Sequence, residues 1–164
     1  MNKIKLLVMD VDGTLTDGKI YMGENGEVMK AFNVKDGYAI AYMLPEMGIT
    51  PVIITGRESK IVENRARELK ISELHQGVQN KLEKLKEVAA KYNASPDEIA
   101  YIGDDLNDLE CLEYCRFSAC PNDSDCLVKK VSFRCQQTGG LGAVREFIEY
   151  LVGEQVNEFR TKCE

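Results

Sequence analysis

The sequence predicts an α/β fold, a Rossmann-like doubly wound parallel sheet with helices on both faces. Three apolar segments of strand length, residues 4–9, 50–54 and 99–102, alternate with segments whose apolar residues recur at helical spacing. Each of the three runs into polar or acidic residues. The 164 residues suffice for one hydrophobic core, so we expect a single domain over residues 1–164.

The first of these segments, Ile4–Met9, contains no residue that disfavours a strand. After it, residues 20–21 and 28–32 flank the turn-rich stretch 23–26. This pattern predicts a β-hairpin flap over about residues 18–33.

A helix is expected to begin at Asp36, because apolar side chains follow at helical spacing. Pro45 lies inside this pattern and should end or kink the helix, and Gly48 should stop it. The buried strand Thr50–Ile54 follows.

The second half of the chain continues the alternation. The tail, about residues 153–164, is expected to be helical or loose. Gly139, Gly140 and Gly142 indicate either a backbone that approaches another segment closely or simply a helix start. The expected elements are a helix capped by Ser59 with Ile61, Val62, Ala66 and Leu69 on one face, a helix over 81–92, a turn at 95–98, a strand over 99–102, a helix over about 106–114, edge strands at 117–119 and 131–133, and a last helix over 143–152.

The composition argues against several functional classes. The net charge of −6 argues against a general nucleic-acid binder, which needs a basic surface to displace counterions. No apolar stretch approaches the roughly 20 residues of a membrane span, so we expect no membrane partner. Asp10 and Asp12 interrupt the N-terminal apolar run, so we expect no export signal and a cytoplasmic location.

The cysteines do not form a metal-binding pattern. No two have C-x-x-C spacing, and His75 is the one histidine of the chain. In a reducing compartment we therefore expect buried or half-buried free thiols. The six are Cys111, Cys115, Cys120, Cys126, Cys135 and Cys163.

Acidic residues follow two of the predicted strands. Asp10 and Asp12 come after the first, and alone they fit either a Mg²⁺ site or a capping turn. Asp104, Asp105 and Asp108 come after the third, and parallel topology would bring both groups to one crevice. Crowded like charges are costly unless a cation lies between them, so the two groups together favour Mg²⁺.

The second strand ends at a candidate anion site. The Thr55 hydroxyl and free backbone N–H groups at Thr55 and Gly56, at the start of a helix, would bind an anion. Lys81 begins its own helix and would add a fixed positive charge. The alternative for Lys81 is a solvated surface lysine.

Four short motifs, DVDGTLTDG, TGRES, QNKL and GDDLND, occur in this order. Together they resemble the motifs of the haloacid dehalogenase superfamily of phosphotransferases, which implies a fold of that type. The resemblance makes Asp10 the nucleophile that forms an aspartyl-phosphate and Asp12 the general acid and then base. Dehalogenases of this superfamily lack the second aspartate, so Asp12 favours phosphate ester hydrolysis.

The resemblance also implies roles around the phosphate and the metal. Phosphoryl oxygens need positive or donor groups, and the metal needs oxygen ligands. The implied assignments are Thr55 and Lys81 to the phosphoryl oxygens; Asp10, the backbone carbonyl of Asp12, and Asp104 to Mg²⁺; and Asp105 and Asp108 to fixing Lys81 or a metal-bound water.

The spacing leaves room for a hairpin but for no cap domain, with 45 positions from Asp10 to Thr55 and 26 from Thr55 to Lys81. Longer segments, IYMGENGEVMKAFNVKDGYAI, IITGRESKIVENRARELKI, HQGVQNKL, YIGDDLNDL and GGLGAVRE, resemble the 3-deoxy-D-manno-octulosonate 8-phosphate phosphatases over most of residues 4–148. This resemblance implies a homotetramer in which the hairpins meet centrally and a neighbouring subunit helps close each active site.

A sister group of phosphatases acts on nine-carbon sugar acids of the sialic-acid type. Its members carry an acidic residue after the Thr-Gly pair and a lysine further on, where this chain has Arg57 and Glu68. Arg65 is expected to bind the sugar carboxylate, with surface solvation as the alternative for both arginines. Gly56 and Lys35 complete the candidate substrate-binding residues, although Lys35 stands where arginine is common.

The sequence therefore predicts a Mg²⁺-dependent phosphatase that hydrolyses 3-deoxy-D-manno-octulosonate 8-phosphate through an aspartyl-phosphate, in lipopolysaccharide synthesis. One alternative is a 9-phosphate phosphatase for a nine-carbon sugar acid (KDN or N-acylneuraminate). An alternative of another class is a non-catalytic assembly module of a sugar nucleotidyltransferase. The chain keeps every acidic residue of the motifs, which such a module would not need.

Overall fold

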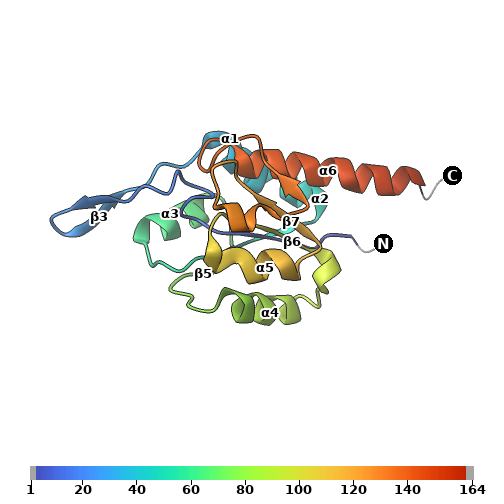
Figure 1. The fold of residues 1–164 in the computed structure, drawn as a ribbon, viewed down its shortest axis with the longest axis horizontal. Helices are drawn as coiled ribbons and strands as arrows, with labels where there is room; N and C mark the ends of the chain where they lie inside the picture. The colour runs from blue at the N-terminus through green and yellow to red at the C-terminus, as the bar shows by residue number, and fades with distance from the viewer. Residues whose placement is uncertain (1–2, 162–164) are drawn as a thin grey trace.

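A six-stranded parallel sheet forms the centre of the computed structural model, which describes residues 3–161 (Figure 1). Helices lie on both faces, as expected for a doubly wound fold. In sheet order the strands are β5 (Glu73–His75), β4 (Thr50–Ile54), β1 (Leu6–Met9), β6 (Ile99–Ile102), β7 (Phe117–Cys120) and β8 (Phe133–Arg134).

The helices form two layers with separate cores. One layer holds α1 (Val34–Tyr38), the π-helical turn η1 (Ala39–Met43), α2 (Leu44–Met47), α3 (Lys60–Glu68) and α6 (Ala143–Thr161). The other holds α4 (Lys81–Lys91) and α5 (Leu109–Tyr114). Short 3-10 turns, η2 (Pro96–Glu98), η3 (Leu106–Asp108) and η4 (Cys126–Lys129), complete the helical elements of the described residues.

Strand β1 shows why the central strands read as unbroken apolar runs. Leu7 and Met9 face the core under α1, α3 and α6, whereas Leu6 and Val8 face the core under α4 and α5. All four side chains are fully buried. A strand covered on both sides has no face on which polar residues would alternate.

The predicted hairpin is present as β2 (Tyr21–Gly23) and β3 (Gly26–Met29) and projects from the body of the protein (Figure 1). We call these two strands the flap hairpin. It is shorter than expected, because Lys30–Asn33 leads into α1 instead of extending the strand. No cap domain accompanies it in residues 3–161. Its strands expose apolar side chains, those of Tyr21, Met22, Val28 and Met29.

Pro45 does not end the predicted helix, which continues through it to Met47. The π-helical turn η1 precedes it, and the backbone N–H of Leu44 bonds five residues back to Ala39. This wider turn accommodates a residue that has no N–H to donate. The helix then ends at Gly48, whose left-handed backbone has φ +69°.

Other boundaries differ from the expected ones. Strand β5 was not predicted, because it is short and includes the charged Glu73 and the polar His75. The last strand is shifted to Phe133–Arg134, and η3 precedes α5 in place of one continuous helix. Helix α6 continues past Val152 to Thr161, so part of the tail is helical; its last three residues lie outside the described chain.

Five of the six cysteines are free thiols in the structure, as expected, and Cys163 lies outside the described residues. Cys126 is exposed and the other four are buried. Within residues 3–161, none of the helices has both the length and the apolar character needed to cross a bilayer.

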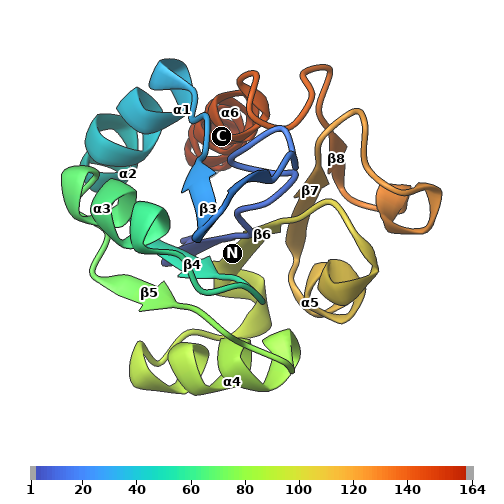
Figure 2. The ribbon, with the colours of Figure 1, turned by 90° about the vertical axis from the view of Figure 1, so that its left-hand side faces the viewer.

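The loop before α6 packs on the loop after β1. Figure 2 looks onto this end of the sheet, where the flap hairpin also emerges. Gly140 donates its backbone N–H to the carbonyl of Thr14 at 3.1 Å. A Cβ added at Gly139 would lie 1.9 Å from the carbonyl oxygen of Gly13. The glycines therefore permit a close approach of two backbones, one of the two expected explanations.

This contact predicts that Gly139→Ala destabilises the protein by about 1–3 kcal/mol, because backbone must move to admit a methyl group. Chemical denaturation followed by circular dichroism would measure the change. Gly153→Ala is the matched control: it lies in α6 with no atom within 4 Å of the added Cβ. We expect that control to be neutral or more stable by about 1 kcal/mol. Equal stability of Gly139→Ala and the wild type would contradict the close-contact interpretation.

Candidate active site

The loop after β1 places Asp10 at the carboxyl end of the sheet. The backbone N–H of Asp10 donates to Ile102 of the neighbouring strand at 3.1 Å. The chain then turns sharply, because the N–H groups of Thr14, Leu15 and Thr16 all donate to the carbonyl of Val11. The side chain of Asp10 is buried at the carboxyl end of β1, next to its neighbour β6.

Asp10, Asp104 and Asp108 form a compact acidic cluster. Each offers one carboxylate oxygen, and these oxygens lie within 4.8 Å of one another. Lys81, the first residue of α4, enters the cluster with its Nζ 2.8 Å from Asp10 Oδ1 and 2.7 Å from Asp108 Oδ1. Lys81 is buried, which excludes the surface-lysine alternative.

Asp108 uses both of its carboxylate oxygens to hold its neighbours. Oδ1 accepts from Lys81 and from the hydroxyl of Tyr101, each at 2.7 Å. Oδ2 accepts from the backbone N–H groups of Asp104 and Asp105 at 3.1 and 3.3 Å. Four donors occupy this carboxylate, so it is a structural anchor and a poor candidate for a metal ligand.

Burial and mutual repulsion distort the ionisation of the cluster. Burial raises the pKa of Asp10 to about 6, and the charge of Asp108 adds to the effect while Lys81 opposes it. Burial likewise raises the pKa of Asp104 to about 8, with a further contribution from Asp10. Burial alone would lower the pKa of Lys81, but Asp10 and Asp108 raise it above its ordinary value. Lys81 thus brings one positive charge to three carboxyl groups, and the cluster lacks positive charge.

A divalent cation fits this deficit. Carboxylates are the ligands that Mg²⁺ prefers, and Asp10 and Asp104 present oxygens that Lys81 and Asp108 do not occupy. Thr14 Oγ1 donates to Asp104 Oδ1 at 2.9 Å and so orients this carboxylate. A Cβ at Gly13 would lie 2.0 Å from Asp104 Oδ2, so only glycine lets the β1 loop approach so closely.

Asp12 lies beside the cluster, in a different electrostatic setting. Its carboxylate contacts Lys30, which follows the flap hairpin, and the Nε of Arg57 lies 3.8 Å from its Oδ2. The side chain is 19% exposed, which leaves it accessible from solvent. The assignment of the Asp12 backbone carbonyl to the metal stays a prediction, and the Asp12 carboxylate itself contacts Lys30 and lies near Arg57.

The end of β4 differs in part from the expected anion site. Thr55 is buried at the strand end, but its backbone N–H donates to His75 of β5 at 2.9 Å and is not free. Helix α3 begins later, at Lys60, and the backbone N–H of Ser59 donates to Gln76 Oε1 at 2.9 Å. The unpredicted strand β5 therefore takes the Thr55 donor, which leaves the Thr55 hydroxyl and the half-buried Gly56 as candidates for contact with phosphate.

The expected contact of Asp105 with Lys81 is not present. Its side chain caps η3 by accepting from the backbone N–H of Leu106 at 2.7 Å. A carboxylate followed closely by a helical turn serves as a cap wherever it can reach the free N–H groups.

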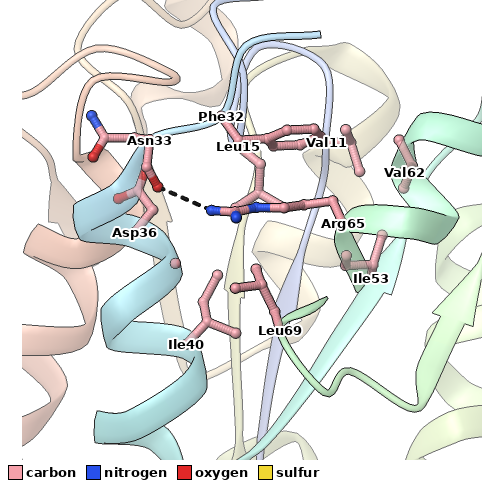
Figure 3. Close-up of a pocket in the computed structure, with 11 residues that line it drawn as sticks. Val11, Leu15, Phe32, Asn33, Asp36, Ile40, Ile53, Val62, Arg65 and Leu69 are labelled. Atoms are coloured by element: carbon pink, nitrogen blue, oxygen red, sulfur yellow. Dashed lines mark hydrogen bonds between the residues drawn. The ribbon is translucent and has the colours of Figure 1, made fainter. Parts of the chain in front are cut away.

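Arg65 lies in the interface between α1 and α3 (Figure 3). Its guanidinium donates to the Asn33 carbonyl at 3.3 Å and to Glu68 at 2.8 Å, and it packs over the ring of Phe32. A cavity of about 10 Å³ beside it also receives Asp36, and Arg65 Nε and Asp36 Oδ2 have no partner there. Within the protomer, Arg65 and Glu68 are thus paired with each other and not joined to the acidic cluster.

The remaining candidates lie at two other places. Arg57 is half exposed at the rim of the site, next to Asp12. Lys35 lines a surface groove with Arg145 and Leu141, away from the acidic cluster of the same chain. The structure therefore brings Arg57 to the site and leaves Lys35 outside it.

Four residues at the site had no role assigned from the sequence. Thr14 belongs to the DVDGT motif, so its motif was the available signal. Tyr101 reads as a core residue, and its hydroxyl in an apolar strand was the only hint. No sequence pattern indicates that Glu27 of the flap hairpin, or Lys30 directly after it, lies near Asp12.

Comparisons with known proteins agree with this geometry. Residues 70–136 match the haloacid dehalogenase-like hydrolase family. The chain is 44% identical over 150 residues to the 3-deoxy-D-manno-octulosonate 8-phosphate phosphatase KdsC of Escherichia coli, covering 91% of this chain and 79% of the relative.

Solved structures give the same result. The 3-deoxy-D-manno-octulosonate 8-phosphate phosphatase of Moraxella catarrhalis, in complex with a magnesium ion, a phosphate ion and KDO, has a TM-score of 0.88 at 37% identity, covering 98% of this chain and 94% of that one. The cobalt-bound phosphatase of Haemophilus influenzae has a TM-score of 0.89 at 33% identity, covering 93% and 90%. Sequence and structure thus point to one group of relatives.

The acidic cluster predicts a stability that depends on metal and pH. Because the folded-state pKa values of Asp10 and Asp104 are raised from 3.8 to about 6 and about 8, metal-free protein should lose stability as the pH rises from about 4, with the Asp10 contribution lost by about pH 6 and that of Asp104 by about pH 8. Saturating Mg²⁺ should raise the melting temperature at pH 8 by about 5–10 °C, and by less at pH 5.5. Thermal melts of chelator-treated protein with and without Mg²⁺ would measure this. Asp104→Asn should abolish the Mg²⁺ response, and a wild type indifferent to Mg²⁺ at pH 8 would contradict the metal site.

Proposed function

The chain belongs to the family of 3-deoxy-D-manno-octulosonate 8-phosphate phosphatases, within the haloacid dehalogenase-like hydrolases, and we propose that it hydrolyses this sugar-acid phosphate with Mg²⁺ as cofactor. The products are 3-deoxy-D-manno-octulosonate and inorganic phosphate. The observation that carries the proposal is the buried Asp10 held by Lys81 beside Asp104, since this arrangement combines a fixed nucleophile with a cation site.

Asp10 is the nucleophile in the first step. Lys81 binds its Oδ1 at 2.8 Å and so fixes the orientation of the carboxylate, whose other oxygen is directed at phosphorus. The Asp10–phosphorus bond forms as the bond from phosphorus to the sugar oxygen breaks. The product of this step is an aspartyl-phosphate.

Asp12 handles the protons of both steps. As a general acid it donates a proton to the departing sugar oxygen, and as a general base it then takes a proton from the water that attacks the aspartyl-phosphate. That attack breaks the Asp10–phosphorus bond and releases phosphate. The partly exposed position of Asp12 suits exchange with both sugar and water.

Positive charge and donors stabilise the transferring group. Bound Mg²⁺, held by Asp10, the Asp12 carbonyl and Asp104, neutralises charge on the phosphoryl oxygens. Lys81 stays charged because of its two carboxylate neighbours and adds a fixed positive charge. Thr55 supplies a hydroxyl donor to the phosphoryl group. Asp108 holds Lys81 in place and orients the loop that carries Asp104.

For substrate recognition we propose Arg57 and Gly56 at the rim of the site. Arg57 is next to Asp12 and half exposed, so its guanidinium is available to substrate hydroxyl groups. Arg65 and Glu68 form an ion pair on α3, and Lys35 lies in a separate surface groove. We assign the sugar carboxylate to Arg65, which would have to exchange part of its contacts with Glu68 and Asn33 for the substrate.

The proposed assembly is a homotetramer that is formed around the flap hairpins. The support for it is the apolar surface that the flap hairpin exposes far from the protomer core, with Met22 64% and Val28 62% exposed. Burial of this surface between copies would be favourable and would cover an otherwise open active site. For location we propose the cytoplasm, in which the free thiols of the structure would persist.

The substrate assignment predicts a higher kcat/KM for 3-deoxy-D-manno-octulosonate 8-phosphate than for a nine-carbon 9-phosphate, measured by phosphate release with Mg²⁺. Arg57 and Glu68 replace the charges of the nine-carbon enzymes, and we expect at least a 10-fold difference, about 1.4 kcal/mol. Asp10→Asn is the control: it should lose turnover while it keeps the fold, since the change removes one buried charge. A preference for the nine-carbon substrate would overturn the assignment, and absence of turnover in the wild type would favour the non-catalytic alternative.

The assembly predicts that the 18.4 kDa chain sediments as a tetramer at micromolar concentration. Val28→Glu on the flap hairpin should shift it toward smaller species, because the carboxylate would be buried without a partner. Analytical ultracentrifugation checks both. Lys60→Glu, an equally exposed change on α3, should leave the distribution unaltered. A monomeric wild type would rule out the shared active site.

A further inference from the structure

A buried lysine connects the flap hairpin to the loop after β1, which carries Asp10 and Asp12 and is called the catalytic loop below. Lys30 directly follows β3, and its side chain is 0% exposed. Its ammonium contacts Asp12 Oδ1 and lies 2.7 Å from Glu27 Oε1. Lysine is rarely buried unless paired, so two carboxylate partners are what make this position tolerable.

One of the two carboxylate oxygens of Asp12 is held by Lys30. Oδ1 is bonded to Lys30, and Oδ2 is the oxygen that lies nearer solvent-exposed Arg57, at 3.8 Å. Without such a partner, the Asp12 carboxylate could rotate about its two side-chain torsions. Glu27 in turn holds Lys30, so the three side chains form a chain of contacts from the flap hairpin to the catalytic loop.

We propose that Lys30 is a positioning residue that fixes the Asp12 carboxyl group in the orientation needed to protonate the departing sugar oxygen. The proposal rests on the proposed function. The ammonium of Lys30 contacts the side chains of Asp12 and Glu27; it acts through the side chain of Asp12, whose backbone carbonyl is the proposed metal ligand. Displacement of a catalytic group by about 1 Å can cost about 100-fold in rate, so loss of this contact should be visible in the chemical step.

A purely structural lysine would behave differently. If Lys30 only anchored the flap hairpin, its removal would weaken every substrate alike. A positioning role instead depends on the leaving group, because a sugar alkoxide needs a proton and p-nitrophenolate does not. Comparing the two leaving groups separates the two roles. The comparison is made in the first turnover, because the later hydrolysis of the aspartyl-phosphate needs Asp12 for either substrate.

The test is a quench-flow measurement of leaving-group release with enzyme in excess and Mg²⁺ present. For Lys30→Met we expect release of the sugar from its 8-phosphate to slow by about 10–100-fold. Release of p-nitrophenolate from p-nitrophenyl phosphate should slow by less than about 3-fold, since no proton is needed. Lys30→Arg, which keeps the charge, should restore part of the sugar-phosphate rate. Lys60→Met, an exposed lysine paired with Glu63, is the matched control and should change neither rate.

Equal slowing of both substrates, or of neither, would overturn the proposal. If Lys30→Met fails to fold, Glu27→Gln loosens Lys30 without removing it and should show the same selectivity at smaller magnitude. Loss of that selectivity in a folded Glu27→Gln protein would also count against it. Failure of the wild type on the sugar phosphate, with p-nitrophenyl phosphate still cleaved, would refute the proposed substrate and not the role of Lys30.

Discussion

The burial of Lys81 between Asp10 and Asp108 is the interaction on which the rest of the site depends. Three carboxyl groups within a few ångströms would repel one another if nothing opposed them. The ammonium offsets part of this repulsion and holds the Asp10 carboxylate in one orientation. Burial, and then the charge of Asp10, still raise the pKa of Asp104, and this uncompensated negative charge makes the site receptive to a divalent cation.

The parallel sheet makes this arrangement possible. Neighbouring strands β1 and β6 run in the same direction, so the residues after Met9 and Ile102 emerge side by side. The hydrogen bond from Asp10 N–H to Ile102 holds the two loops in register. Helix α4, which lies in the helical layer with α5, then places Lys81 beside Asp10. No single element contains the site, which forms only when the sheet is complete.

The sequence predicted the parts of the site that sheet topology determines. Asp10 and Asp104 were expected to meet because each follows an apolar run, and parallel strand ends share an edge. The expected contact of Asp105 with Lys81 was wrong, because the Asp105 side chain caps the following turn by accepting from the backbone N–H of Leu106. The backbone N–H of Thr55 is not free as expected, because it donates to β5. This three-residue strand has too few apolar residues to show a pattern. Lys30 was missed because its contact with Asp12 arises from the path of the chain after the flap hairpin.

That path has a pharmacological consequence. The flap hairpin carries exposed apolar side chains on its strands in the protomer, and Lys30, which directly follows it, contacts Asp12. If Lys30 has the proposed role, a small molecule that bound at the base of the flap hairpin and displaced this ammonium from Asp12 would slow the proton transfer. Such an inhibitor would not need to imitate a charged sugar phosphate.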